Sequence, residues 1–291
     1  MTGNCVQRFM LDDLDIRGAV VHLTSVWQQL LQKRDYPAPV ISLLGQMSAT
    51  AVLLADNLKQ PGRLTIQLRG DGPISLLVID CNQALNVRCM AQHGKDIDND
   101  AHASDIDLLG QGQLLLSLDT PAMHEPYQSI VPLTGNNIAE IFEHYLKQSE
   151  QLASRFFLAA GPSGIAGLFL QKMPTTDERD RDGWARMEAL ACTVTSNELL
   201  DLSAERLLAR LFHEEDVRVF AAQEVTNNCP EDWEKVGNML RSLGRGEVYG
   251  ALQERGAIVI RDDLANREYR FDKTAIDTLF KNTPETPPTV H

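Results

Sequence analysis

The chain has 291 residues, of which 43% are hydrophobic and 23% charged, as expected for one large or two ordinary globular domains. Its formal charge of −13 argues against binding nucleic acids or anionic membranes, because both require basic surfaces. Five cysteines without a C-x-x-C pair fit reduced thiols in the cytoplasm better than a secreted disulfide framework.

The first elements in chain order are two helices. Residues 25–34 are predicted to form a helix with a serine cap, and Pro37 ends it. A second helix is predicted to run to about residue 59. Its apolar stretch 41–55 is too short and too polar for a membrane span, so we expect it in the core.

The hydrophobic period changes from helical to alternating at residue 64, which predicts a half-buried strand. Asn137 can cap a later helix. Strand runs with segregated helices predict an α+β core domain over residues 1–174. The further strands are predicted at 74–80, 84–92, 112–119, 128–133, ASRFFLAA and GIAGLFLQK.

Residues 175–228 are predicted to form a helical linker. The charged stretch DERDRD marks its beginning. Thr195 and Glu198 have the spacing of a capping box, and the stretch 203–212 places leucines on a helix. The helices are short, charged and only partly amphipathic, so we expect them to need a partner surface to stay folded.

Residues 229–282 are predicted to form a small domain of helices and one hairpin. A helix from Pro230 to Gly244 would have proline in its first turn and glycine at its end, as helices prefer. The stretches AIVIRD and REYRF flank a turn and predict the hairpin. The tail 283–291 is predicted to be disordered.

No phosphate-binding loop, dinucleotide fingerprint or zinc-protease motif occurs in the sequence. His213 has no second histidine at ligand spacing, so we expect it on a solvated or packed helix face. The acidic segment 96–107, with Asp96, Asp98, Asp100 and Asp107, is spaced like a calcium loop. Ala101 replaces the glycine of such a loop, so a solvated segment is expected.

The cysteines have ordinary interpretations. Cys81 and Cys89 are predicted to lie on or beside adjacent strands as small buried side chains, and Cys192 is interpreted in the same way within a helix. Cys5 is expected to be a reactive thiol near a mobile terminus.

Several segments in the same order resemble the bacterial thirty-three-kilodalton heat-shock protein family of redox-regulated chaperonins. They are DYPAPV, LTIQLRGDGPISLLVI, SEQLASRFFL, AGLFLQKMP and LFHEEDVRVF, and the resemblance covers nearly the whole chain. It implies a cytoplasmic, ATP-independent holdase with an α+β core, a helical linker and a C-terminal zinc domain. It also implies that four cysteine thiolates hold zinc in the inactive form. Oxidation would release the zinc and expose a client-binding surface on a dimer.

The sequence departs from this family at the zinc site. The ligand positions fall on Cys229, Glu231, Asp262 and Ala265, so one thiolate of four remains. Structural zinc requires four good ligands, and we therefore expect no zinc and no other cofactor. Cys229 is interpreted as the remnant of a redox switch whose internal disulfides cannot form. Without metal, a unit of about 60 residues is marginal in stability.

We therefore expect a holdase that prevents aggregation of unfolding proteins without depending on the zinc–disulfide switch. Its expected partners are unfolded clients and a second copy of the chain, with no nucleic acid and no membrane. The same residues that bind clients could instead only cover the core. The candidate client-binding residues are Trp184, Met187, Leu190, Leu199, Leu200, Leu207, Leu208 and Leu211.

Two other functions remain open at this point. A binding or regulatory module on the same scaffold would bind one folded partner without general chaperone action. A thiol enzyme would need a lowered pKa of Cys229, which a helix beginning at Pro230 could supply. Glu231 and Asp232 oppose that shift, and no base or second cysteine is near in the sequence. We therefore expect no enzyme.

Overall fold

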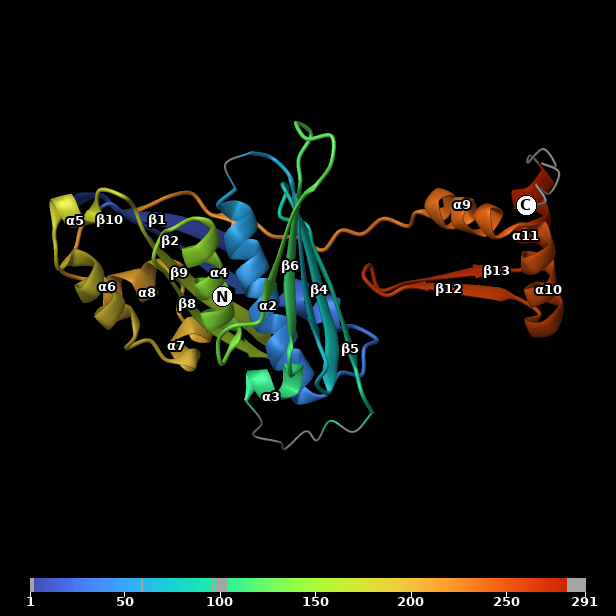
Figure 1. The fold of residues 1–291 in the computed structure, drawn as a ribbon, viewed down its shortest axis with the longest axis horizontal. Helices are drawn as coiled ribbons and strands as arrows, with labels where there is room; N and C mark the ends of the chain where they lie inside the picture. Colours follow the sequence, from blue (N-terminus) through green and yellow to red (C-terminus); the bar gives the residue numbers. More distant parts are fainter. Residues whose placement is uncertain (1–2, 59, 96, 98–103, 282–291) are drawn as a thin grey trace. The chain divides into compact units, whose positions relative to one another are not determined.

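The computed structural model describes residues 3–58, 60–95, 97 and 104–281 (Figure 1). The chain divides into two compact units, Met1–Asn228 and Cys229–His291. The predicted disordered tail and most of the acidic segment 96–107 lie outside the described residues. Asp107 is described and belongs to a short helix, α3 (Asp105–Leu109), which Ser104 caps.

The first unit contains two antiparallel sheets, and four strands of the first one were not predicted. Sheet A has the order β10-β1-β2-β9-β8, and β11 also pairs with β1. The end of the predicted helical linker thus forms two short strands that pair with the N-terminal strand. The strands are β1 (Cys5–Leu11), β2 (Ile16–Leu23), β8 (Ser154–Gly161), β9 (Gly164–Lys172), β10 (Val217–Val219) and β11 (Gln223–Glu224).

Sheet B confirms the strands predicted from alternation, in the order β5-β4-β3-β6-β7. On β3, Leu64, Ile66 and Leu68 are buried, as the period of two requires. The strands are β3 (Arg63–Gly70), β4 (Ile74–Asn82), β5 (Val87–His93), β6 (Gly112–Asp119) and β7 (Tyr127–Pro132).

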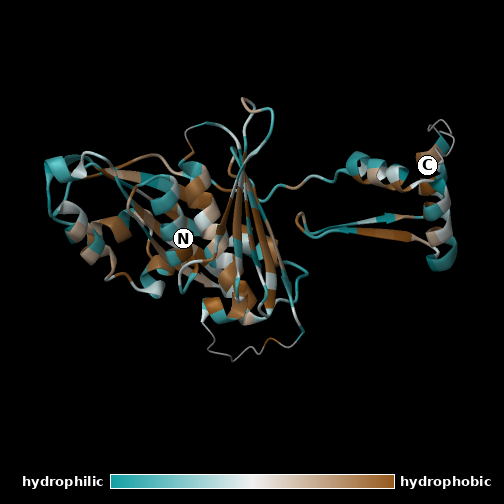
Figure 2. Ribbon diagram, viewed as in Figure 1, coloured by the Kyte–Doolittle hydropathy of each residue, from teal (hydrophilic) through white to brown (hydrophobic). Residues whose placement is uncertain are grey.

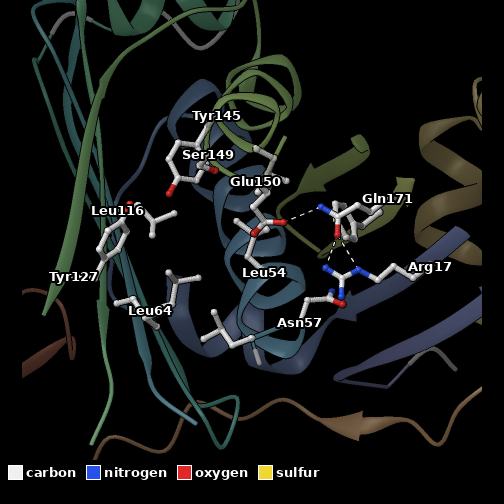
Figure 3. A pocket seen from close by; sticks show the side chains of 14 residues that line it. Arg17, Leu54, Asn57, Leu64, Leu116, Tyr127, Tyr145, Ser149, Glu150 and Gln171 are labelled. Carbon is white, nitrogen blue, oxygen red and sulfur yellow. Dashed lines mark hydrogen bonds between the residues drawn. The ribbon is translucent and has the colours of Figure 1, made fainter. Parts of the chain in front are cut away.

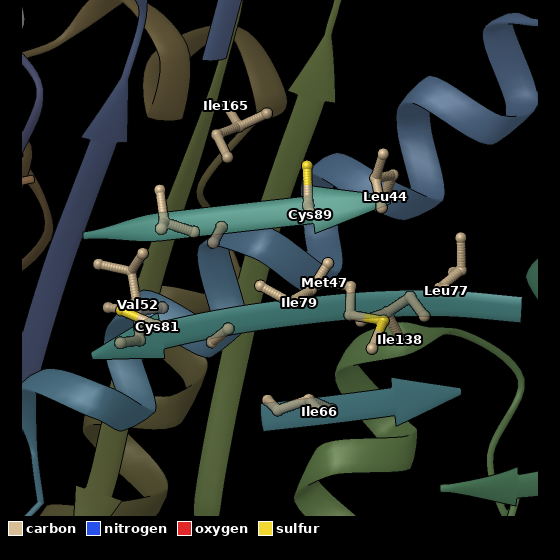
Figure 4. Packing of buried hydrophobic residues seen from close by; sticks show 14 of the residues in the cluster. Leu44, Met47, Val52, Ile66, Leu77, Ile79, Cys81, Cys89, Ile138 and Ile165 are labelled. Carbon is tan, nitrogen blue, oxygen red and sulfur yellow. The ribbon is translucent and has the colours of Figure 1, made fainter. Parts of the chain in front are cut away.

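Helix α2 (Ala38–Asp56) packs against both sheets and fills the main core (Figure 4). Among the described residues it is the one helix long and apolar enough to cross a membrane, but 67% of its apolar stretch is buried inside the protein. Helix α1 (Ser25–Leu31) precedes it, and α4 (Ile138–Ser149) begins at the predicted cap, Asn137. The two sheets with segregated helices confirm the α+β fold.

The second unit has its own small core. Side chains from α9 (Trp233–Leu243), α10 (Arg245–Arg255) and α11 (Lys273–Lys281) pack on the hairpin of β12 (Ile258–Asp262) and β13 (Arg267–Phe271). The helix predicted to begin at Pro230 begins at Trp233, so that prediction of the start is wrong. The Asp232 carboxylate accepts a hydrogen bond from the Lys235 N–H and caps the helix there.

Candidate functional site

Sheet A is apolar on both faces. On β2, Ala19, Val21 and Leu23 belong to the main core beside α2, whereas Ile16 and Val20 point to the opposite side and join a second core. All but the last residue of β9 is buried. Runs such as AVVHL and GIAGLFL lack alternation for this reason, since a strand buried on both faces has no solvent side.

Three short helices cover this second face. They are α6 (Gly183–Ala191), α7 (Ser196–Asp201) and α8 (Ala204–Leu211), which we call the linker helices (Figures 1 and 2). The segment that precedes them contains α5 (Thr176–Arg179), which contacts η1 (Asp12–Leu14). The buried sheet residues beneath the linker helices, here called the covered face, are Phe9, Leu11, Ile16, Val20, Ala159, Ala166, Leu168 and Leu170.

All eight predicted client-binding residues lie at this one interface. Five of them are almost fully buried, with at most 2% of each residue exposed: Met187, Leu199, Leu207, Leu208 and Leu211. The other three, Trp184, Leu190 and Leu200, are partly buried against the same cluster. In this conformation the linker leucines therefore cover sheet A, and their apolar surface becomes available only when the linker helices separate from it.

Local sequence explains why the linker helices begin where they do. The predicted capping box of Thr195 and Glu198 is formed, and Ser203 caps α8 by accepting from the Arg206 N–H. The longest linker helix has nine residues. Isolated helices below about 12–15 residues are marginal in water, so docking on the covered face is what keeps these helices folded.

Arg155 on β8 forms ion pairs with both the core and a linker helix. Its guanidinium binds Glu143 of α4 at 2.6 Å and also binds Glu188 of α6. Burial raises the pKa of Glu143, while hydrogen bonds from the Phe156 N–H and Arg155 oppose that rise. The arginine side chain is 43% exposed, so these ion pairs set the position of α6 more than they stabilise it.

His22 is a polar residue at the covered face that sequence reasoning missed. It is 3% exposed, and its Nε2 lies 2.7 Å from the Leu199 carbonyl oxygen of α7. Burial lowers the pKa of His22. The available signal was a histidine inside the unbroken apolar run AVVHL, where a polar ring must find a buried partner.

A separate pocket of about 240 Å³ lies on the other side of sheet A (Figure 3). Leucines of α2, β3 and β6 form one wall. At the other wall the Arg17 Nε donates to Gln171 Oε1 at 2.8 Å, and Gln171 Nε2 donates to Glu150 at 3.1 Å. This chain of contacts satisfies the buried amide of Gln171 and joins β2 to β9.

The four positions that the sequence resemblance assigns to zinc ligands make other contacts in this structure. The Asp262 carboxylate accepts from the Ala265 N–H at 2.9 Å and closes the hairpin turn. The Glu231 carboxylate accepts from the Trp233 indole at 2.7 Å. Cys229 is buried, and its carbonyl accepts from Arg267 at 2.8 Å. Within the described ranges no three His, Cys, Asp or Glu side chains could jointly hold a metal ion. These residues do not fit a tetrahedral zinc centre.

We expect that a zinc chelator leaves the thermal unfolding of the second unit unchanged. A structural zinc contributes about 10–16 kcal/mol in finger peptides, so its removal would unfold such a unit outright. Circular dichroism melting with and without chelator, together with metal analysis of the purified protein, measures this. A drop in the melting temperature with one bound zinc per chain would contradict the expectation.

Three positions differ from their predicted environments. Cys192 is exposed rather than buried, because α6 ends at Ala191 and Cys192 is its cap. Cys5 is the first residue of β1 and pairs with His22 of β2, and burial raises its pKa, which opposes the predicted reactivity. His213 is solvated as expected, but it lies in a turn after α8 rather than on a helix.

Cys81 and Cys89 are buried on the adjacent strands β4 and β5, as predicted. Burial, with the nearby carboxylates, raises the pKa of Cys81 to about 12. A thiol held protonated in this way is a poor nucleophile. These two cysteines are therefore packing residues of the main core.

A sheet with a large apolar face under short, marginal helices is an arrangement suited to a chaperone, which needs apolar surface that can be exposed. The family model described as "Hsp33 protein" matches residues 4–272. The chain therefore belongs to the Hsp33 family of chaperones, which is not a class of enzymes.

Relatives and a solved structure agree with this assignment. The chain is 41% identical to a 33 kDa chaperonin of Methylobacillus flagellatus over 94% of both chains. It is 40% identical to a 33 kDa chaperonin of Chromobacterium violaceum, covering 94% of this chain and 93% of the other. The crystal structure of the 33 kDa chaperonin of Thermotoga maritima has the same fold, with a TM-score of 0.79, 21% identity, and 96% and 98% coverage.

Proposed function

We propose that this protein is an ATP-independent holdase that binds unfolding proteins through the covered face of sheet A and the apolar side of the linker helices. The observation that carries the proposal is the second core, in which both surfaces are apolar and pack against each other. Separation of the linker helices would expose both surfaces to a client at once. The proposed compartment is the cytoplasm, and the proposed active form is a homodimer.

The energetics of docking allow such a separation. Burial of one leucine side chain contributes about 1.5–3 kcal/mol. Ordering the backbone of one linker residue costs about 1–2 kcal/mol, and most residues of the linker helices are not buried leucines. These opposing terms are of similar size, so the docked linker is a low-stability element that heat can release before the rest of the core unfolds.

The proposed release does not use a zinc–disulfide switch. One cysteine stands at the four family ligand positions, so two internal disulfides cannot form there. The carboxylates of Glu231 and Asp262, at two of the other positions, accept hydrogen bonds from the protein, as described above. Heat, local unfolding or constitutive opening would then control client binding. An intermolecular disulfide of Cys229 would be a residual thiol response, and it requires this buried cysteine to become exposed first.

Light scattering of a heat-unfolding client tests this function. With the protein kept fully reduced, we expect suppressed aggregation at a stoichiometric ratio and no requirement for ATP. Peroxide treatment should add little. Suppression only after peroxide would show that redox control persists through the remaining thiols, and no suppression under either condition would reject the holdase.

A further inference from the structure

We propose that protonation of His22 releases the linker helices from sheet A, so that the binding surface opens when the pH falls as well as when the temperature rises. This proposal rests on the proposed function, since it concerns the regulation of the same surface. The imidazole of His22 lies between sheet A and the linker helices.

His22 joins the two layers directly. It lies on the linker side of β2, in the same alternation as Ile16 and Val20, and is 3% exposed. Its Nε2 is 2.7 Å from the Leu199 carbonyl oxygen, which belongs to α7. In the neutral ring Nε2–H can donate this bond, so the docked linker is satisfied without a charge at this place.

The groups that face His22 do not compensate a positive charge fully. Cys5 lies directly opposite on β1, and burial and Glu205 raise its pKa, so it stays a neutral thiol. On β9 the opposite residue is Ala166, which does not titrate. The Leu199 carbonyl and the Glu205 carboxylate of α8 both favour the imidazolium. Burial outweighs these two attractions and lowers the pKa of His22.

The direction of the pH effect follows from linkage. When the linker helices separate, His22 is hydrated and regains its ordinary pKa of about 6.5. Between that value and the lower pKa of the docked state, release takes up one proton, so acid favours release. The shift is at most about tenfold in the release equilibrium per pH unit. Above the ordinary pKa the effect disappears.

Two carboxyl groups near the linker helices also titrate, in a different pH range or with the opposite sign. The Glu205 N–H and then the hydroxyl of Ser203 and the amide of Gln7 hold the pKa of Glu205 below its usual value, so protonation of Glu205 acts in the same direction at lower pH. Burial raises the pKa of Glu143 at the Arg155 contact, which acts in the opposite direction. The Glu143 contribution does not involve His22 and is equal in wild type and in a His22 variant. The interaction of Glu205 with His22 is lost in the variant, so the comparison measures the histidine together with this pair.

The test uses the full-length chain and the fluorescence of a dye that binds exposed apolar surface, between pH 7.5 and 5.5 at 25 °C. We expect dye binding to rise as the pH falls in wild type and in His213→Gln, an exposed control. In His22→Gln, whose amide can donate to Leu199 but does not titrate, the rise should be absent. Equal acid responses in His22→Gln and wild type, or no response in wild type, would overturn the proposal.

Two further measurements keep the test decisive. Melting at pH 7.5 shows whether His22→Gln is folded, and His22→Asn is the alternative if it is not. The NMR titration of the wild-type imidazole needs no variant: a pKa at the ordinary value in the docked protein would also overturn the proposal. The dye reports linker release without any client, so failure of this proposal differs from failure of the holdase, which is measured by light scattering at pH 7.5.

Discussion

Replacing Leu207 with glutamate is expected to make the protein suppress client aggregation at 25 °C without heat. Leu207 is fully buried between α8 and sheet A. Loss of a buried leucine costs about 2–5 kcal/mol, and a buried unpaired carboxylate adds to that cost. The release equilibrium should therefore shift by at least about thirtyfold, because each 1.4 kcal/mol is a factor of ten.

Ala209→Glu is the matched control, because it adds the same charge to the exposed side of the same helix. We expect it to behave like wild type. Dye binding reports release, and light scattering with a chemically unfolded client reports holding. If Leu207→Glu binds the dye strongly yet suppresses no aggregation, the covered face is not the client surface.

Replacing Phe271 with alanine is expected to unfold the second unit while the first unit keeps its thermal transition. Phe271 is 5% exposed and packs edge-on against Trp233, with ring centroids 5.4 Å apart. Truncation of a buried phenylalanine costs about 3–5 kcal/mol. A unit of about 60 residues without metal has little more stability than that to lose.

Val259→Ala is the control for this change, because Val259 lies in the same hairpin and is 50% exposed. Thermal melting followed by circular dichroism, with one transition expected for each unit, measures this. The expected result is loss of the second unit's signal in Phe271→Ala alone. A wild-type second unit that folds only after zinc is added would contradict packing as its source of stability.

The sequence predicted sheet B better than sheet A, for a physical reason. The strand of Leu64, Ile66 and Leu68 has a polar face toward solvent, so its period of two is visible. In sheet A, β2 is buried on both faces and shows no period, and the short strands β10 and β11 depend on pairing with β1. Strand pairs distant in sequence leave little local signal.

The sequence by itself determined the α+β class, the family and the apolar linker residues, because each follows from residue types and their spacing. Only the tertiary structure decided that Leu207 and its neighbours cover sheet A, and that His22 meets the Leu199 carbonyl. His22 and Leu199 are 177 positions apart. Burial and hydrogen bonding between such distant residues arise from packing, which local periodicity does not encode.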